Sequence, residues 1–184
     1  MKRVFIIHGW GGSPDGGWKP LLKMELEKRN FVVCAPQMPD TKNPKMHEWI
    51  SELSKLIQTP DSETYLVGHS LGGITVLRYL ESLKTGKAGG AVLIGTPIDN
   101  RDIEEISTFF ENPIDWKKIK TYCRKFISIN SDDDYYIPIS HGEKIRNELG
   151  SELIVKKRHK HFSGDDGFTE LPVALESVLK LAGE

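Results

Sequence analysis

The pentapeptide GHSLG at positions 68–72 contains residue types that can do nucleophilic chemistry. It matches the pattern G-x-S-x-G, in which a strand turns sharply into a helix and presents the serine at the edge of a sheet. Small residues two positions before and after the serine allow this turn without a collision at Cβ. An apolar run, Tyr65–Val67, precedes the motif, and a helical pattern, Ile74–Leu83, follows it. We therefore expect Ser70 to be a nucleophile.

A nucleophilic serine needs a base that takes its proton and a third group that holds the base in the correct tautomer. In hydrolases with this motif, an acid and then a histidine follow the serine along the chain. His159 and His161 lie just past the last strand-like run, where a loop could reach Ser70. His161 is favoured because it is further from the strand and precedes a turn-like segment, residues 162–164. The alternatives are a basic surface loop or part of a metal site, for which we find no further ligands at a suitable spacing.

The acid is expected after the strand-like run Phe126–Asn130, where Asp132, Asp133 and Asp134 follow one another. Two of the three must be solvated, cap a helix or bond to the loop itself. The whole run could also be a polar turn. Composition does not choose among the three aspartates.

A tetrahedral intermediate needs two backbone N–H donors for its oxyanion. Leu71, directly after the serine, would supply one donor. The other is expected from the glycine-rich loop at residues 8–12, with Trp10 as its contributor. A dinucleotide fingerprint fails in this loop because its third glycine would fall on Pro14, and no P-loop lysine follows. We expect neither a cofactor nor a metal.

Short β-type runs that alternate with helical patterns must position these groups. The expected strands are Val4–Ile7, Phe31–Ala35, Tyr65–Val67, Ala91–Ile94, Phe126–Asn130 and Leu153–Val155. The expected helices include residues 47–57, 74–83, 140–149 and 171–181, with another beginning near Pro20. Strands that are apolar on both faces are typical of parallel sheets covered by helices. The pattern predicts a single three-layer α/β domain over residues 1–184.

The segment after Gly95-Thr96-Pro97 interrupts this alternation. It carries Phe109, Phe110, Pro113, Ile114 and Trp116 among many charges. One interpretation is a pair of short helices packed on the edge of the sheet. The other is a small lid over the pocket, because long connections at strand ends often line binding sites.

Composition excludes several classes of function. Charged residues make up 28% of the 184 residues and the net charge is −1, which is not typical of nucleic-acid or membrane-surface binding. Cys34 and Cys123 do not form a disulfide framework. The apolar run after Met1 is too short for a signal peptide, and no segment is long enough to span a bilayer. We expect a cytoplasmic protein with a small-molecule acyl substrate.

Several segments together resemble the small α/β-hydrolase family of serine hydrolases typified by retinoblastoma-binding protein 9 and its bacterial relatives. The matching segments are Val4–Gly12, Thr64–Gly73, Gly95–Pro97, Phe110–Lys120, Asp132–Pro138 and His161-Phe162. The family's acid lies four residues before a proline, which assigns that role to Asp134, with Asp133 as the main rival. Its histidine precedes a phenylalanine, which assigns that role to His161.

The resemblance implies a shortened hydrolase sheet of about six strands with a minimal cap. It also implies a carboxylesterase-type activity through a Ser-His-Asp triad and an acyl-enzyme. The pocket-protein-binding L-x-C-x-E segment of the animal protein is absent around both cysteines, so that partner is not expected. We expect Trp10, Phe109, Trp116 and Phe162 to contact the substrate. The alternatives are a non-catalytic interaction module on a hydrolase scaffold, or the same nucleophile acting on lactones or C–C bonds.

Overall fold

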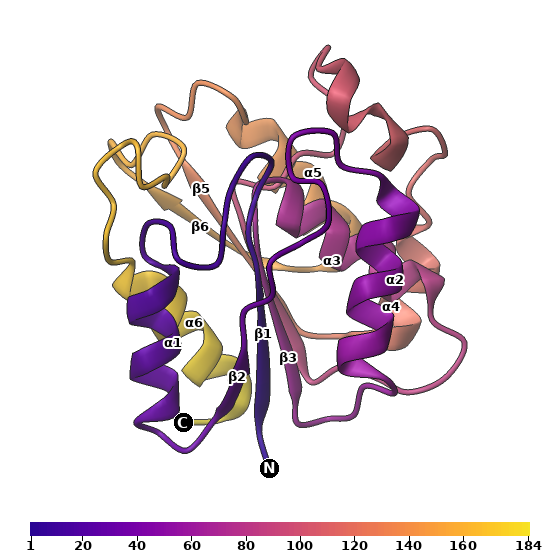
Figure 1. Ribbon diagram of the computed structural model, residues 1–184, viewed down its shortest axis with the longest axis vertical. Helices are drawn as coiled ribbons and strands as arrows, with labels where there is room; N and C mark the ends of the chain where they lie inside the picture. Colours follow the sequence, from indigo (N-terminus) through magenta and orange to yellow (C-terminus); the bar gives the residue numbers. More distant parts are fainter.

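A single parallel sheet of six strands forms the centre of the protein, and the computed structural model describes all 184 residues (Figure 1). In order across the sheet, the strands are β2 (Val32–Cys34), β1 (Arg3–Ile7), β3 (Thr64–His69), β4 (Gly90–Ile94), β5 (Phe126–Ser131) and β6 (Glu152–Lys156). All neighbouring strands are parallel. The α/β fold with about six mostly parallel strands is therefore confirmed, with bounds that differ from the expected ones by at most two residues.

Helices cover both faces of this sheet. On one face lie α1 (Lys19–Glu27) and α6 (Pro172–Ala182); on the other lie α2 (Met46–Ile57), α3 (Leu71–Ser82), α4 (Trp116–Tyr122) and α5 (Ile139–Leu149). Each face has its own apolar core, of 23 residues on the α3 side and 18 on the α1 side. Every residue of β3, β4 and β5 is buried, as the predicted apolar runs require.

Helix α3 packs closely against the sheet because glycine stands at its first turn. A Cβ added to Gly72 would collide with the carbonyl oxygen of Ile7 in β1, and one added to Gly73 would collide with the Thr96 hydroxyl. The absence of side chains at these two positions lets the helix begin directly above the carboxyl ends of the central strands. The residues that are expected to do chemistry lie at the same strand ends.

The long connection after β4 forms a short 3-10 helix, η1 (Glu104–Phe109), followed by α4. One of the two interpretations placed a pair of short helices on the edge of the sheet; the two short helices are present, but both pack against α3. Arg78 of α3 is buried, and its guanidinium donates to the carbonyl oxygens of Phe109, Asn112 and Pro113 and pairs with Glu81. The connection is thereby fixed to the body of the protein.

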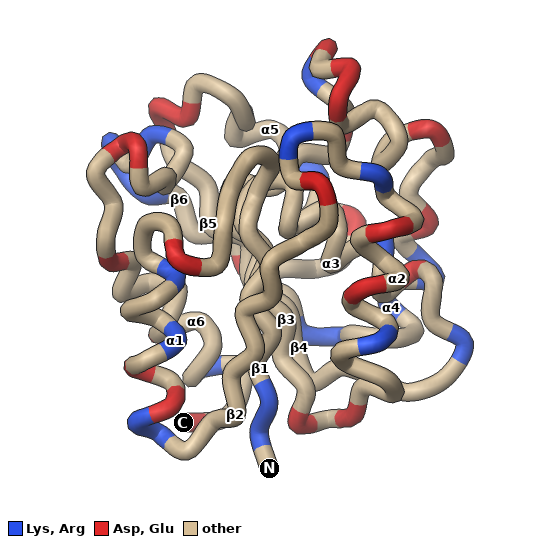
Figure 2. The backbone as a smooth tube through the Cα atoms, viewed as in Figure 1, with Lys and Arg blue, Asp and Glu red and all other residues tan.

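Charges of both signs are interspersed along the surface segments, without a single-sign face in this view (Figure 2). None of the helices combines the length and the apolar character that crossing a membrane requires.

We predict that Gly72→Ala destabilises the fold by about 1–3 kcal/mol, because the new methyl group must displace the backbone of β1. Urea denaturation should show a lower midpoint with an unchanged m-value. Gly16→Ala is the matched control, since its nearest neighbour would lie at an ordinary 3.5 Å. Equal midpoints for the two variants would show that the first turn of α3 tolerates a side chain.

Candidate active site

The backbone at Ser70 adopts a strained conformation, with φ 54° and ψ −121°, between the end of β3 and the start of α3. A residue other than glycine holds such angles only where its surroundings impose them. A Cβ added to Gly68 would lie 2.5 Å from the carbonyl oxygen of Gly72, so only glycine fits before the turn. The turn raises the serine side chain above the carboxyl edge of the sheet.

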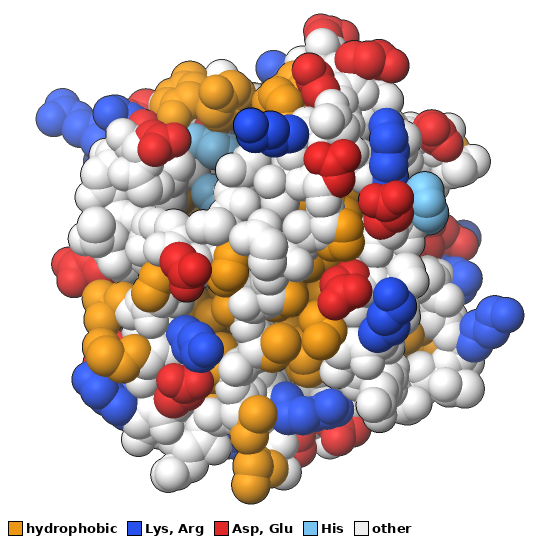
Figure 3. Space-filling model, viewed as in Figure 1, with side chains coloured by type: hydrophobic (Ala, Val, Ile, Leu, Met, Phe, Trp, Pro, Cys, Tyr) orange, Lys and Arg blue, Asp and Glu red, His pale blue; other side chains and the backbone are white.

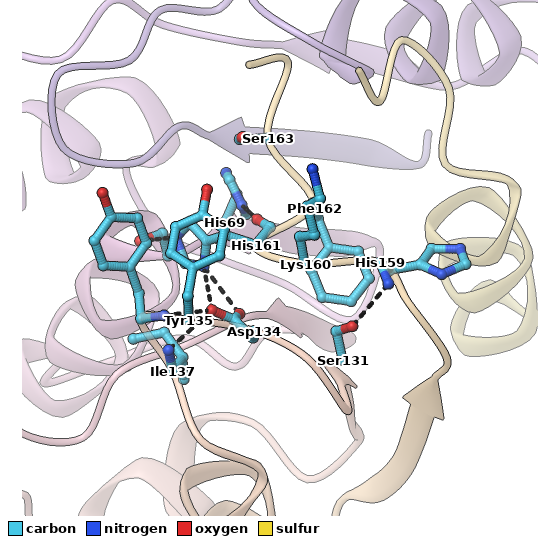
Figure 4. Close-up of polar contacts among 12 residues, drawn as sticks. His69, Ser131, Asp134, Tyr135, Ile137, His159, Lys160, His161, Phe162 and Ser163 are labelled. Carbon is cyan, nitrogen blue, oxygen red and sulfur yellow. Dashed lines mark hydrogen bonds and ion pairs between the residues drawn. The ribbon is translucent and has the colours of Figure 1, made fainter. Parts of the chain in front are cut away.

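A continuous chain of hydrogen bonds joins three of the predicted residues. The Ser70 hydroxyl lies 2.9 Å from Nε2 of His161, and Nδ1 of His161 lies 2.9 and 3.1 Å from the two carboxylate oxygens of Asp134. A carboxylate only accepts, so Nδ1 carries the proton and the free Nε2 faces the serine. The structure thus brings Ser70, His161 and Asp134 together from three separate segments, and Figure 4 shows the contact between His161 and Asp134.

The neighbouring aspartates hold the loop that carries His161. Asp132 accepts the backbone N–H of Arg158, and Asp133 accepts that of Lys160, each at 2.8 Å. Asp134 is itself fixed, because its Oδ1 accepts the backbone N–H groups of Tyr136 and Ile137 at 2.9 Å. Each aspartate therefore has a different partner, and only Asp134 faces the imidazole.

This loop is strained and needs those contacts. Arg158, Lys160 and Phe162 all have positive φ, between 45° and 57°. The Ser131 hydroxyl accepts the N–H of His159, as Figure 4 shows, and the Asp166 carboxylate accepts that of His161 at 3.2 Å. Alternating left-handed residues turn successive N–H groups toward fixed acceptors, which sets the position of the imidazole.

Two side chains from elsewhere bind the carbonyl groups of the same loop. Nε2–H of His69 donates to the carbonyl oxygen of His161 at 2.7 Å, and the indole N–H of Trp18 donates to that of Phe162 at 2.9 Å. Burial lowers the pKa of His69 well below its usual value, with smaller contributions from the charges of His161 and Lys19. His69 is therefore a neutral donor that ties the loop to the residue beside Ser70.

The loop after β1 is oriented by His8. This buried imidazole donates from Nδ1 to the carbonyl oxygen of Gly9 at 2.8 Å and accepts the N–H of Met38 at Nε2. Burial lowers its pKa, so it is neutral. The N–H of Gly12 also donates to the Gly9 oxygen. In a trans peptide the N–H opposes the carbonyl, so the N–H of Trp10 points away from these contacts.

The loop after β1 also lies against the serine, since a Cβ on Gly9 would be 3.1 Å from Cβ of Ser70. Leu71 is the first residue of α3, and N–H groups in the first turn of a helix have no partner within it. Neither the N–H of Trp10 nor that of Leu71 donates a hydrogen bond among the turns and loops, and both residues line the same cavity as Ser70.

A cavity of about 580 Å³ opens above Ser70 and His161. Its apolar lining comes from Trp10, Leu71, Pro97, Ile103, Ile106, Tyr135, Tyr136 and Ile137. Figure 3 shows histidine side chains in a hollow on this face of the molecule, with hydrophobic side chains at its border. No cluster of three or more His, Cys, Asp or Glu side chains is arranged to hold a metal ion.

Of the four expected substrate contacts, only Trp10 lines this cavity. Phe109 is fully buried in the core, edge-on to Trp49, and Phe162 is fully buried in the core on the other face. Trp116 packs against the α3-side core at the start of α4. The expectation for these three residues is corrected for a common reason: their large apolar surfaces are used in packing.

Sequence reasoning missed His8, His69 and Asp166 as supports of the site. His8 and His69 end buried strands, where an unpaired imidazole would be costly, so their positions offered a signal. The Asp166 carboxylate receives the Ser163 and Tyr135 hydroxyls besides the N–H of His161. Burial raises its pKa, but these hydrogen bonds outweigh that effect and lower it.

The chain is similar to known proteins over nearly its whole length. A family model described as "Serine hydrolase" matches residues 4–180. YdeN of Bacillus subtilis (strain 168), which is named as a hydrolase, is 32% identical over 95% of this chain and 93% of its own. Serine hydrolase RBBP9 of Rattus norvegicus is 27% identical over 96% and 95%.

The fold is also similar to that of solved structures. The crystal structure of the B. subtilis ydeN gene product has a TM-score of 0.95 over the whole of both chains, with 29% identity. Est1E of Butyrivibrio proteoclasticus, with ferulic acid bound, has a TM-score of 0.76 over 100% of this chain and 90% of its own. At 12% identity, this second likeness concerns the fold alone.

We predict that stability falls as the pH drops below about 6.5. The pKa of His69 is lower in the folded than in the unfolded chain, so the unfolded state binds more protons there. For each such histidine the free energy of unfolding falls by up to about 1.4 kcal/mol per pH unit as the pH decreases, and His8 acts in the same direction. We expect the free energy of unfolding, measured by urea denaturation between pH 7.5 and 5, to fall less steeply with decreasing pH for His69→Gln than for the unsubstituted protein. An identical slope would contradict the neutral, buried state of His69.

Proposed function

Because the chain belongs to the serine hydrolase family, we propose that it hydrolyses carboxylic esters through a covalent acyl-enzyme. The observation that carries this proposal is the hydrogen-bonded chain from Ser70 through His161 to Asp134. The strained turn at Ser70 supports it, because it has the strand–turn–helix form of a nucleophile elbow.

The proposed reaction begins when the Ser70 oxygen attacks the ester carbonyl carbon and its proton passes to Nε2 of His161. Asp134 keeps the imidazole in the Nδ1–H tautomer and stabilises the imidazolium that forms. The tetrahedral intermediate collapses as the C–O bond to the alcohol breaks, and His161 returns the proton to the leaving oxygen. Water then attacks the acyl carbon as its proton passes to Nε2 of His161. The C–O bond to Ser70 breaks, His161 returns the proton to the serine oxygen, and the carboxylic acid leaves.

The oxyanion of both intermediates is assigned to the N–H groups of Trp10 and Leu71. Donors that are already fixed need no rearrangement when the charge develops, and each is worth several kcal/mol in related cases. His8 is a positioning residue for this purpose, because its bond to the Gly9 carbonyl sets the direction of the Trp10 N–H. Ile103, Ile106 and Trp10 supply an apolar wall for the substrate.

We predict that Ser70→Ala lowers kcat on p-nitrophenyl butyrate by on the order of 10³-fold or more, because no other group can form the acyl-enzyme. Labelling by a fluorophosphonate probe should be lost in the same variant. Ser51→Ala, an exposed serine in α2, serves as the control for both measurements. Undiminished turnover by the Ser70 variant would contradict the assigned nucleophile. The absence of both turnover and labelling in the unsubstituted protein would favour the non-catalytic alternative.

We predict that Asp134→Asn lowers kcat by about 10²–10⁴-fold, because an amide N–H facing Nδ1 favours the wrong tautomer. Asp133→Asn is the matched comparison, since Asp133 bonds the loop backbone and not the imidazole. We expect the decrease in kcat to be far smaller for Asp133→Asn than for Asp134→Asn. A larger loss in the Asp133 variant would transfer the triad role to the adjacent aspartate.

A further inference from the structure

Lys19 is a buried lysine that lines the same cavity as Ser70. Only 6% of the residue is exposed, yet its ammonium takes part in none of the ion pairs or hydrogen bonds of the protein. Long lysine side chains normally extend their charge into water. Its one favourable contact is with the face of the Trp18 ring, so the lack of an anionic partner for this buried cation needs an explanation.

The position of Lys19 places its charge near the reacting groups. Its Nζ lies 5.5 Å from the centroid of the Trp18 ring, and that ring is edge-on to His69, the residue before Ser70. The positive charge of Lys19 helps to lower the pKa of both His8 and His69. The ammonium is not among the fully enclosed unpaired polar atoms, so it remains open to the cavity.

Burial of this ammonium is costly. Desolvation lowers the pKa of Lys19 to about 8, and no carboxylate within 4 Å offsets it. Leaving one buried charge without its partner is strongly unfavourable, whereas a well-placed anion restores the balance. By contrast, buried Arg78 donates four hydrogen bonds, three to carbonyl oxygens and one to the Glu81 carboxylate. The missing partner of Lys19 points to a ligand.

The surroundings of Lys19 also suit an anion. Lys19 is the first residue of α1, a helix of nine residues whose N-cap, Trp18, makes no side-chain cap bond. N–H groups and the dipole at such a helix start favour negative charge. The hydroxyl side chains that line the cavity are those of Ser13, Ser70, Ser163, Thr169, Tyr135 and Tyr136. Two other charged residues line the cavity, the anion Asp165 and the cation Arg101. Both are exposed, unlike Lys19.

We propose that the ester substrate bears a separate carboxylate and that Lys19, with the start of α1, binds it beside Ser70. One buried ammonium, with no second buried cation among the lining residues, matches a single negative charge and not a phosphate dianion. This inference rests on the proposed ester hydrolysis and adds the class of substrate: monoesters of dicarboxylic acids, or esters of hydroxy acids.

Two pairs of esters test the proposal. The p-nitrophenyl monoester of glutaric acid is compared with p-nitrophenyl valerate, and 4-carboxyphenyl butyrate with phenyl butyrate, so that the charge lies on the acyl side or on the alcohol side. We expect Lys19→Met to lower kcat/KM for the acidic member of one pair at least tenfold more than for its neutral partner. Lys19→Gln is a second variant of similar length. Arg101→Gln, at an exposed cation of the same cavity, is the control and should change the ratio of kcat/KM between the acidic and the neutral ester less.

Calorimetric titration with glutarate separates this proposal from the proposed function. If wild-type protein binds glutarate and Lys19→Met does not, while no ester is cleaved, the carboxylate site stands and ester hydrolysis fails. If neutral esters are cleaved but neither pair shows a preference that depends on Lys19, the carboxylate site is overturned. It is also overturned if Lys19→Met slows neutral and acidic esters equally, because the lysine would then act on the transition-state charge of every ester.

Discussion

The site depends on how the end of β5 holds the loop that follows β6. Three consecutive aspartates and Ser131 bind successive groups of that loop, and the loop backbone would not keep its left-handed residues without them. A loop free to relax would move the imidazole away from Ser70. The side chain that faces the imidazole is therefore inseparable from its two neighbours, which fix the loop.

The parallel sheet makes this convergence possible. In parallel strands all carboxyl ends lie at one edge, so segments that follow β1, β3, β5 and β6 meet there although they are far apart in sequence. Glycines at the start of α3 let the helix approach β1, and the tight packing imposes the strain at Ser70. The proposed nucleophile and oxyanion donors thus lie on one packed support, while the proposed base comes from a loop held by hydrogen bonds.

The buried ionisable side chains around the site are either neutral or paired with hydrogen-bond acceptors, with one exception. His8 and His69 are neutral: His8 donates to a carbonyl oxygen and accepts a backbone N–H, and His69 donates to the carbonyl oxygen of His161. Arg78 is surrounded by carbonyl oxygens and a carboxylate. Lys19 departs from this pattern only on the wall of the cavity, where a ligand can complete it. Lys19 begins α1, directly after the loop that carries Trp10, so the proposed carboxylate site and the proposed oxyanion donor come from neighbouring parts of the chain.

The sequence by itself determined the alternation of strands and helices and the turn at Ser70, because apolar periodicity and glycine spacing are local properties of the chain. It also limited the proposed base to the loop after the last strand and the proposed acid to positions 132–134. The resemblance to a family, and not the spacing, pointed to Asp134. Only the tertiary structure decided which carboxylate faces the imidazole, since the three aspartates have identical chemistry and differ only in direction. It also decided that Phe109, Trp116 and Phe162 belong to packing and that Lys19 lines the cavity, because burial depends on residues distant in sequence.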